Sequence, residues 1–522
     1  MKRRNFFKTA ALGGGTIVLA PLSSCIPSTT PSDSSENYAD FELNELTLAQ
    51  LQEQINSGKL TSEEITQKYL NRIEQINTKG PELRAVIEVN PDALKIARKM
   101  DAERKSGKIY GQLHGIPILI KDNIDTGDQM QTTAGSLALV GSPAPDDAII
   151  VRKLREAGAV LLGKTNLSEW ANFRSNKSSS GWSGRGGQVR NPFCIDRSPC
   201  GSSSGTGVAI SANLCAIGIG TETDGSIVCP SGINGIVGIK PTVGLWSGDG
   251  IVPISHSQDT AGPMARTVTD AAILLGLLAE KQQDFTPNLK VDGLKGARIG
   301  IASDFFGFHS EVEKLMADAI QKLKDSGVVI VEDLKFENRE EWGKLEWQVL
   351  ISEFKTDLNV YLKTRSGVPV QSLADVIEFN KKNNPELKWF GQEIMEEAEK
   401  TGGLEEPVYL QALAKAKKLT REKGIDLVMD LHQLDALIAP TNGPAWTIDW
   451  VNGDHFGGGS SEPAAIAGYP AITVPAGFVH GLPVGISFFG RAWSEPVLIK
   501  LAYAFEQATK HRKAPEFIKS IE

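Results

Sequence analysis

Hydrophobic and polar positions alternate along this chain with two periods, one typical of helices and one typical of buried strands. Apolar positions at helical spacing run through residues 43–76, and Thr61-Ser62-Glu63-Glu64 matches a capping box, the pattern that begins a helix. Shorter apolar runs predict strands at 84–89, 113–120 and 159–163, with helices at 92–105 and 147–158. This alternation predicts an α/β protein with a mixed central β-sheet.

The stretch 198–241 differs from the rest of the chain in composition. It is rich in Gly, Ser and Thr and poor in charge, and its apolar run at 214–219 predicts a buried strand or helix. Flexible Gly/Ser linkers lack the interleaved Val, Ile, Leu and Cys found here. The stretch is therefore predicted to form a buried site in which the backbone approaches a ligand closely.

The first 24 residues have the layout of an export signal. Lys2-Arg3-Arg4 precedes aromatic residues and an apolar stretch at 10–22 that is too short for a confident membrane span. The paired arginines favour the twin-arginine route. Leu22-Ser23-Ser24-Cys25 resembles a bacterial lipobox, which predicts lipidation of Cys25; cleavage by an ordinary signal peptidase is the alternative. The protein is expected to be exported, as a periplasmic protein or a membrane-anchored lipoprotein.

Beyond the signal, the sequence predicts one tether and one domain. Residues 25–42 are rich in Ser, Thr and Pro and predict a flexible tether. Residues 43–522 are enough for a large core and show no internal repeat, so a single domain is expected. Within it, residues from about 280 to 430 are more charged and are predicted to form a helical, cap-like region. Apolar strands resume after Asp435 and are expected to return to the same sheet.

Composition and charge narrow the classes of partner. The chain is 41% hydrophobic and 23% charged, as in ordinary soluble globular proteins. Its net charge of -8 and its pI of about 5.6 give no electrostatic support for binding nucleic acid or an anionic membrane. No nucleic-acid partner is expected, and membrane contact is expected only through an N-terminal lipid.

Four cysteines follow Cys25, and their spacing matches no zinc pattern. Cys215 and Cys229 lie among apolar residues and are predicted to be plain buried thiols. Cys194 and Cys200 could pair in an oxidising compartment. Since twin-arginine cargo generally folds before export, the reduced state of these two is favoured.

Several motifs, taken in order, resemble the amidase signature family of serine amidohydrolases, and the resemblance covers roughly residues 43–512. The matching segments are Gly115-Ile116-Pro117-Ile118-Leu119-Ile120-Lys121-Asp122, Gly201-Ser202-Ser203-Ser204-Gly205, Gly220-Thr221-Glu222-Thr223-Asp224-Gly225-Ser226-Ile227, Gly238-Ile239-Lys240-Pro241, Asp435-Ala436-Leu437-Ile438-Ala439-Pro440-Thr441 and Gly468-Tyr469-Pro470-Ala471-Ile472-Thr473-Val474-Pro475. Segments 182–188 and 198–201 look closest to bacterial peptide amidases. Ser204-Gly205-Thr206-Gly207 departs from the Ser-Gly-Gly of many relatives. The resemblance implies a mixed central sheet with helices on both faces.

The resemblance also implies a Ser-Ser-Lys triad: Ser226 as nucleophile, Ser202 as bridging serine and Lys121 as general base. The residues themselves agree with this chemistry. Lys121 ends an apolar run, so burial should favour its neutral form, which can accept a proton relayed from Ser226 through Ser202. Taken alone, a lysine at a strand end or a serine between glycines is usually a solvated or turn residue; the joint occurrence favours the triad.

An oxyanion hole is expected at the turn that carries the nucleophile. Backbone N–H groups of Thr223, Asp224, Gly225 and Ser226 are suited to hold the negative oxygen of a tetrahedral intermediate. The family also implies a cis peptide between Gly201 and Ser202.

A rival enzyme class shares the same stretch. Gly201-Ser202-Ser203-Ser204-Gly205 formally matches the G-x-S-x-G elbow of α/β-hydrolases, with Ser203 as nucleophile. An elbow should follow an apolar strand, whereas residues 190–199 contain prolines and charges. The acid and histidine that it needs have no clear candidate; His455 is the histidine most readily placed near a pocket, and a loop position accounts for it equally well.

No cofactor or metal is expected, since neither a phosphate loop nor an H-E-x-x-H motif occurs. Five aromatic residues could line a substrate pocket, although such residues are more often core: Trp342, Trp347, Trp389, Phe390 and Trp446.

The expected reaction is hydrolysis of a carboxylic amide to an acid and ammonia or an amine. A C-terminal peptide amide is the favoured substrate, and aryl, fatty or other small amides are the alternative. An export signal argues against the amidase component of a tRNA-dependent amidotransferase, because its substrates are cytoplasmic. A lipoprotein that binds amides without turnover is expected to have a broken triad, and all three triad residues are present.

Overall fold

The computed structural model describes residue 38 and residues 40–521. The predicted signal peptide, Cys25 and most of the predicted tether lie outside the described residues. Residues 39–522 form one compact unit. No helix among the described residues is both long enough and apolar enough to cross a bilayer.

An eleven-stranded sheet runs through this unit, in the order β1-β3-β2-β6-β8-β7-β12-β13-β11-β9-β10. Its strands are β1 (Val86–Val89), β2 (Pro117–Lys121), β3 (Val160–Thr165), β6 (Ile217–Glu222), β7 (Val237–Lys240), β8 (Thr260–Ala265), β9 (Arg298–Ala302), β10 (Val329–Leu334), β11 (Ala436–Pro440), β12 (Ala471–Val479) and β13 (Leu482–Phe489). A separate pair joins β4 (Trp182–Ser183) to β5 (Gly187–Gln188). Strand β2 is parallel to β3 and β6, while β6 and β8 are antiparallel, so the predicted mixed sheet is confirmed.

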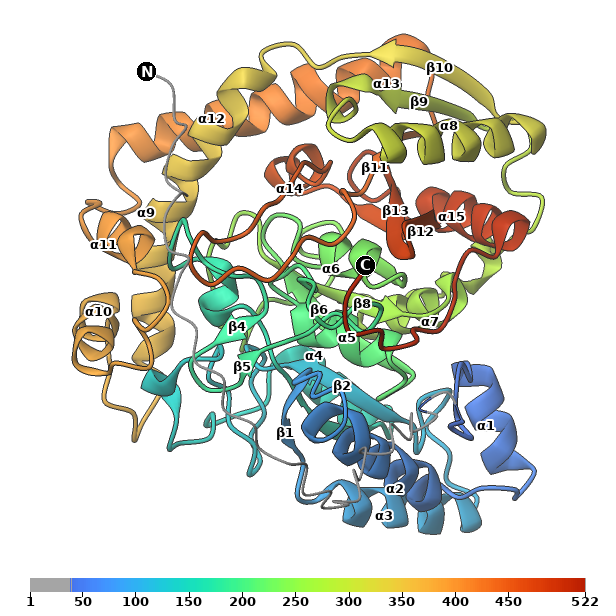
Figure 1. The fold of residues 1–522 in the computed structure, drawn as a ribbon, viewed down its shortest axis with the longest axis vertical. Helices are drawn as coiled ribbons and strands as arrows, with labels where there is room; N and C mark the ends of the chain where they lie inside the picture. The colour runs from blue at the N-terminus through green and yellow to red at the C-terminus, as the bar shows by residue number, and fades with distance from the viewer. Residues whose placement is uncertain (1–37, 39, 522) are drawn as a thin grey trace, which may run out of the picture. The chain divides into compact units, whose positions relative to one another are not determined.

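Helices flank the sheet, as the predicted α/β class requires (Figure 1). They are α1 (Leu48–Asn56), α2 (Ser62–Arg72), α3 (Ala93–Lys105), α4 (Ile149–Glu156), α5 (Ser204–Ser211), α6 (Val228–Ile233), α7 (Val268–Leu278), α8 (Ser310–Asp325), α9 (Trp342–Leu362), α10 (Leu373–Lys382), α11 (Glu393–Glu399), α12 (Pro407–Thr420), α13 (Asp426–His432), α14 (Glu462–Ala467) and α15 (Glu495–Thr509). The capping box at Thr61 is present. The helical run predicted at 43–76 is divided, because the chain turns at Gly58 (φ +73°) between α1 and α2.

Strands β2 and β6 position the candidate site. All five residues of β2 are buried, which explains why this strand is a continuous apolar run and not an alternating one. Leu119 lies opposite Gly218 and Ile120 opposite Ile219 in the parallel ladder. Because the carboxyl ends of parallel strands meet at one edge of a sheet, Lys121 and the turn after Glu222 come to the same place.

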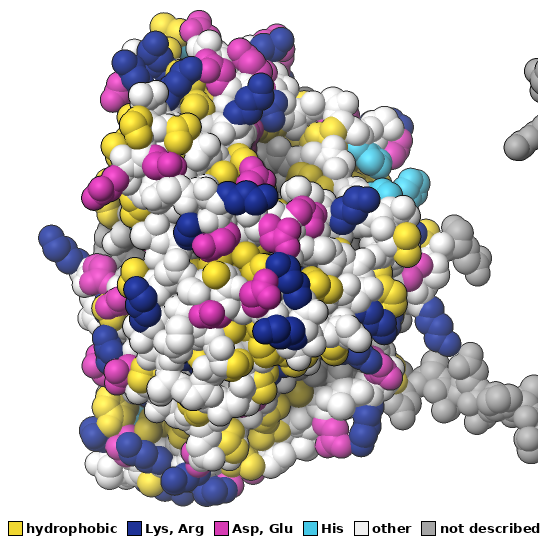
Figure 2. Space-filling view, turned by 90° about the vertical axis from the view of Figure 1, so that its left-hand side faces the viewer, with side chains coloured by type: hydrophobic (Ala, Val, Ile, Leu, Met, Phe, Trp, Pro, Cys, Tyr) yellow, Lys and Arg dark blue, Asp and Glu magenta, His cyan; other side chains and the backbone are white. Residues whose placement is uncertain are grey.

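The region predicted as a helical cap, about 280–430, contributes to the sheet as well. Its β9 and β10 pair with each other, and β9 pairs with β11, so the first part of this region belongs to the sheet. The helices α9 to α12 follow and pack on one another. On the side that carries α10 and α11, Lys and Arg are interspersed with Asp and Glu, as expected for a solvated surface (Figures 1 and 2). The predicted helical region therefore begins too early in the chain, because charge alone does not distinguish strands such as β9 and β10 from helices.

The C-terminal strands return to the same sheet, as predicted. Strand β12 pairs with β13 on one side and with β7 on the other, where Ala471 lies opposite Lys240. This pairing joins the two halves of the sheet.

Candidate active site

Lys121 lies fully buried at the end of β2 and makes three hydrogen bonds. In its ammonium form, Nζ donates to Ser202 Oγ (2.7 Å), to Thr221 Oγ1 (2.8 Å) and to the Thr221 carbonyl oxygen (3.2 Å). Asn123 Nδ2 also donates to Thr221 Oγ1 (3.0 Å), so this hydroxyl is held from two sides. All of these acceptors are uncharged, and no described carboxylate forms an ion pair with the amine.

Burial without an ion-pair partner lowers the pKa of Lys121 to about 7. The negative charges of Asp259 and Glu222 oppose this shift without cancelling it. The lysine is therefore substantially neutral near pH 7 and can accept a proton, as a general base must.

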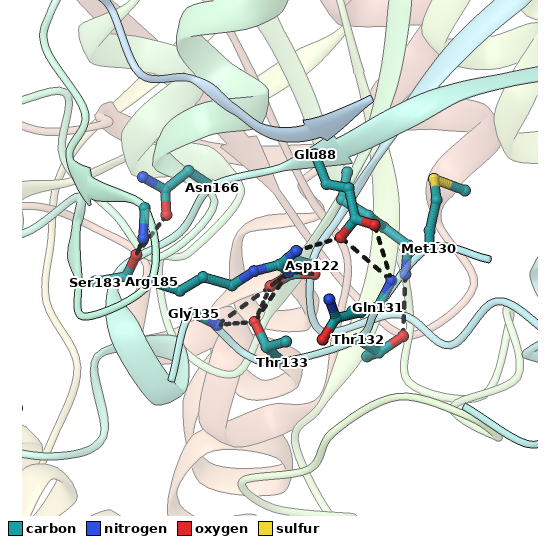
Figure 3. Close-up of polar contacts among 12 residues, drawn as sticks. Glu88, Asp122, Met130, Gln131, Thr132, Thr133, Gly135, Asn166, Ser183 and Arg185 are labelled. Carbon is teal, nitrogen blue, oxygen red and sulfur yellow. Dashed lines mark hydrogen bonds and ion pairs between the residues drawn. The ribbon is translucent and has the colours of Figure 1, made fainter. Parts of the chain in front are cut away.

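The residue after Lys121 anchors the strand end to two other segments (Figure 3). The Asp122 carboxylate accepts hydrogen bonds from Thr133 Oγ1 and from the Gly135 backbone N–H (3.4 Å). Arg185, on the turn between β4 and β5, lies between Asp122 (3.3 Å) and Glu88 of β1 and pairs with both. This network fixes the backbone that carries Lys121.

Ser202 and Ser226 lie on two neighbouring segments. Ser202 precedes α5, and Ser226 lies on the turn between β6 and α6. The Ser203 backbone N–H donates to the Ser226 carbonyl oxygen (3.1 Å), which places the two segments side by side. The peptide between Gly201 and Ser202 is cis, as predicted. Ser226 Oγ makes no hydrogen bond to any described residue, whereas Ser202 Oγ contacts Lys121.

The turn at 223–226 leaves its backbone donors free. Among the described residues, none of the four N–H groups predicted for the oxyanion hole donates a hydrogen bond. Glu222 shapes the turn, because its Oε2 accepts from the backbone N–H groups of Ile227 (2.6 Å) and Val228 (2.9 Å) at the start of α6. Gly225 has φ +79°, and a Cβ there would lie 3.0 Å from Ser461 Oγ. The turn therefore presents free donors and requires glycine at this position.

A cavity of about 350 Å³ opens beside this turn. Its lining includes Gly201, Asp224 and Gly225, serine and asparagine side chains from 172–180, and the rings of Trp446 and Phe456. Asp454 also lines it and accepts from Trp446 Nε1 (2.9 Å) and the Ser180 backbone N–H (3.0 Å). Within the described chain no lysine or arginine lines this cavity, so it suits neutral or cationic ligands.

The cysteine predictions need correction. Cys200 and Cys229 form a disulfide with a Cα–Cα distance of 6.1 Å, so Cys229 is not a plain thiol and the pair considered for Cys194 and Cys200 does not form. The turn at 223–226 brings the first turn of α6 against Cys200, a proximity that sequence spacing does not reveal. Cys194 is buried and donates to Asp196 Oδ1 (3.1 Å). Cys215 is a free buried thiol, as predicted.

The competing elbow finds no support in this geometry. Ser203 is fully buried, and its hydroxyl is already used: it donates to the Thr221 carbonyl oxygen (2.9 Å) and accepts from the Thr221 N–H (3.1 Å). No described histidine contacts it. His455 is largely exposed and lies 3.3 Å from Asp449. Ser203 thus ties α5 to β6.

The aromatic residues proposed for the pocket divide into two groups. Trp446 lines the cavity at the turn. The others pack elsewhere: Trp342 is fully buried, Trp347 packs on Phe173, Trp389 stacks on Trp450 and Phe390 packs on Trp182.

Sequence reasoning did not single out Thr221, Asn123, Glu222 or Arg185. Each lies within two residues of a matched motif or inside one, at Lys121-Asp122-Asn123, at Gly220-Thr221-Glu222 and in 182–188. Their polar character beside buried catalytic candidates was the available signal.

Comparisons with known proteins agree with one another. The family model described as Amidase matches residues 64–499. A peptide amidase from Stenotrophomonas maltophilia, solved by X-ray crystallography, is 51% identical with a TM-score of 0.87, covering 91% of this chain and 99% of that one. A probable amidase of Arabidopsis thaliana is 42% identical, covering 92% of this chain and 93% of that protein. The A component of the glutamyl-tRNA(Gln) amidotransferase of Symbiobacterium thermophilum is 34% identical, with coverage of 90% and 98%.

Proposed function

Since this chain belongs to the amidase family and is an amide-hydrolysing enzyme, we propose that it hydrolyses a carboxylic amide through an acyl-enzyme formed on Ser226. The observation that carries the proposal is the 2.7 Å contact between Lys121 Nζ and Ser202 Oγ, made by a buried lysine whose pKa is lowered to about 7. A neutral amine in contact with a serine is the arrangement that a proton relay requires.

In the proposed first step, Ser226 Oγ attacks the carbonyl carbon of the amide. Its proton passes to Ser202, and the Ser202 proton passes to neutral Lys121. The carbonyl oxygen becomes an oxyanion, which the free N–H groups of 223–226 can stabilise; loss of one such donor typically costs about 2.7–4 kcal/mol of barrier. The relay then reverses, so that Ser202 delivers a proton to the departing nitrogen and the amine leaves.

The second step removes the acyl group. Water attacks the acyl carbon of the Ser226 ester, and Lys121 again takes a proton through Ser202. The oxyanion forms against the same donors, and its collapse breaks the ester bond. The carboxylic acid leaves, and Ser226 regains its proton.

We propose a C-terminal peptide amide as the substrate class. Similarity to a peptide amidase over 91% of the chain supports it, and so does a cavity lined by Ser and Asn side chains that can bond to a peptide backbone. Aryl, fatty or other small amides are the alternative. The amidotransferase component is a less similar relative, at 34% identity, and the predicted export signal separates this chain from cytoplasmic tRNA chemistry.

The test is ammonia release from a blocked dipeptide amide, compared between wild type and Ser226→Ala, with labelling by a fluorophosphonate probe mapped by mass spectrometry. We expect the adduct on Ser226, slower labelling in Lys121→Ala, and loss of at least about 10⁴-fold in kcat for Ser226→Ala. An adduct on Ser203 that is indifferent to Lys121→Ala would contradict the triad and favour the elbow. Absence of both adduct and ammonia would favour a binding lipoprotein.

We also propose export and lipidation at Cys25. The arginine pair, the apolar stretch and the lipobox-like segment support it, and a disulfide between Cys200 and Cys229 suits an oxidising compartment. Incorporation of labelled palmitate into the wild type, and its loss in Cys25→Ala, is the expected result. An unlabelled wild type that is found outside the cytoplasm would favour ordinary signal-peptidase cleavage.

A further inference from the structure

The two serine segments are joined by hydrogen bonds and by a disulfide. The 3.1 Å bond from the Ser203 N–H to the Ser226 carbonyl oxygen joins their backbones, while Ser226 Oγ bonds to no described residue. Near the cysteines, Asn234 Nδ2 donates to the carbonyl oxygens of Pro199 (2.9 Å) and Pro230 (2.7 Å). The disulfide adds a covalent link between the same segments. Cys200 lies two residues before Ser202, and Cys229 lies three residues after Ser226.

The backbone at Cys200 is in an unfavourable region. Cys200 has φ +57°, where a residue with a side chain is stable only when its surroundings hold it. Its carbonyl oxygen accepts from Ser204 Oγ (2.6 Å), and its N–H donates to Ser198 Oγ (3.2 Å). The disulfide holds the side chain of this residue against α6, so it supports the conformation that leads into Ser202.

The disulfide forms part of the cavity wall. Cys200 and Cys229 both line the 350 Å³ cavity, together with Gly201 and Gly225. The disulfide also packs in an apolar cluster with Phe193, Cys194, Ile233, Ala445 and Leu482, and with Trp446, which lines the cavity as well. We therefore expect a small dithiol to reach the disulfide from this cavity.

The remaining described cysteines, Cys194 and Cys215, do not line the cavity. Cys215 donates to the Pro117 carbonyl oxygen (3.0 Å), and burial raises its pKa to about 11. Burial also raises the pKa of Cys194. Since the thiolate is the reactive form, both are poor nucleophiles for attack on the disulfide. Among the described residues, the Cys200–Cys229 bond is the disulfide that a reductant can open.

We propose that the Cys200–Cys229 disulfide is a positioning pair that holds Ser202 against Ser226 for proton transfer, an inference that rests on the proposed triad. A dithiol reductant supplies two electrons and two protons to the S–S bond, leaves two thiols and becomes a cyclic disulfide itself. The open form then lets the Ser202 segment move relative to α6. A displacement of about 1 Å at a reacting centre can reduce turnover by about 100-fold.

The experiment compares oxidised and dithiothreitol-treated wild type at native pH, with thiol counting to verify reduction and circular dichroism to verify folding. We expect kcat for the peptide amide to fall by about 10- to 100-fold, KM to change by less than about threefold, and the rate of fluorophosphonate labelling of Ser226 to fall with kcat.

Cys200→Ala/Cys229→Ala should show the same low kcat with or without reductant. The matched control, Cys194→Ala/Cys215→Ala, should respond to reductant as wild type does. A competitive inhibitor in the cavity should slow reduction.

Full kcat in enzyme shown to be reduced would overturn the proposal, and so would a loss of kcat that only follows unfolding. If the double variant fails to fold, reduction of folded wild type decides between these outcomes. Failure of the proposed function is separate: it would appear as an oxidised wild type that releases no ammonia.

Discussion

Lys121 and Arg174 are both fully buried basic side chains, and the protein surrounds them in opposite ways. Lys121 contacts three uncharged oxygens and no carboxylate among the described residues. Arg174 pairs with Glu169 (2.5 Å) and Glu386 (3.5 Å) and donates to the carbonyl oxygens of two cap residues. Its guanidinium also lies over the ring of Phe390 (4.4 Å).

The difference separates a reactive group from a structural one. Burial without a partner favours the neutral form of Lys121, the form that can accept a proton in the proposed relay. Arg174 carries a guanidinium, which does not deprotonate in proteins. Its bonds to Glu386 and to the carbonyl oxygens of Gly391 and Phe390 tie this loop to the core.

Lys121→Met is expected to have the largest effect on activity and little on stability. Removal of the base should lower kcat by about 1,000-fold, because general-base catalysis typically contributes 10²–10⁴-fold. The methionine fills the same buried space without a charge, so the urea midpoint should stay close to wild type. Steady-state kinetics and urea denaturation measure the two quantities. Wild-type turnover in this variant would remove Lys121 from the mechanism.

Arg174→Met is expected to show the reverse pattern. It leaves the Glu169 carboxyl group buried without its cation and takes a hydrogen-bond donor from Glu386, which should cost about 3 kcal/mol of folding stability. The kcat of the folded enzyme should stay within about threefold of wild type. Arg152→Met, on the surface of α4, is the matched control and should change stability by less than about 0.5 kcal/mol. Equal stability of the two variants would show that the buried cluster is not structural.

The pH profile sharpens the assignment of Lys121 as the titrating base. Wild-type kcat/KM should rise about tenfold per pH unit below the lysine pKa and level off above about pH 7, because the neutral form is the active one. Thr221→Val removes an acceptor that favours the ammonium form, so the midpoint should move to lower pH, with about a tenfold loss of kcat. A midpoint that moves upward, or does not move, would contradict this role for Thr221.

Glu386→Gln should have the smallest effect. Burial and the neighbouring Glu169 raise the pKa of Glu386 to about 9, so the folded protein binds a proton there at neutral pH while the unfolded chain does not. Stability from this group is therefore lost as pH rises from about 5 to 9. The glutamine variant lacks this loss, so it should be at least as stable as wild type at pH 7, by an amount that grows with pH. A variant less stable than wild type at pH 7 would show that Glu386 is ionised.

The elements with strong periodicity could be predicted from the sequence. The buried run of β2 and the capping box of α2 are local patterns, and both are present. The Lys121–Ser202 contact was expected through the family resemblance, since no local signal links residues 81 positions apart. Charge and helical content in 280–430 concealed β9 and β10, because their structure depends on pairing of β9 with β11 and of β10 with β9.

Two features could not be predicted from the sequence: the Cys200–Cys229 disulfide and the contacts of Glu222 with α6. Both depend on the turn at 223–226. That turn folds α6 back against Cys200 and so determines which cysteines pair. It also places Glu222 under the first N–H groups of α6. Both outcomes depend on three-dimensional proximity, which residue types and spacing do not encode.

The pairing of β7 with β12 has a consequence for synthesis of the chain. Lys240 meets its partner Ala471 only after the intervening residues have been made, which takes about 10–50 s at typical rates of about 5–20 residues per second. Until then β7 is the unpaired edge of a partly built sheet, and all four of its residues are ones the finished enzyme buries. Exposed edges of this kind recruit other strands. Between the emergence of β7 and that of β12, this buried strand is therefore open to pairing with strands of other chains.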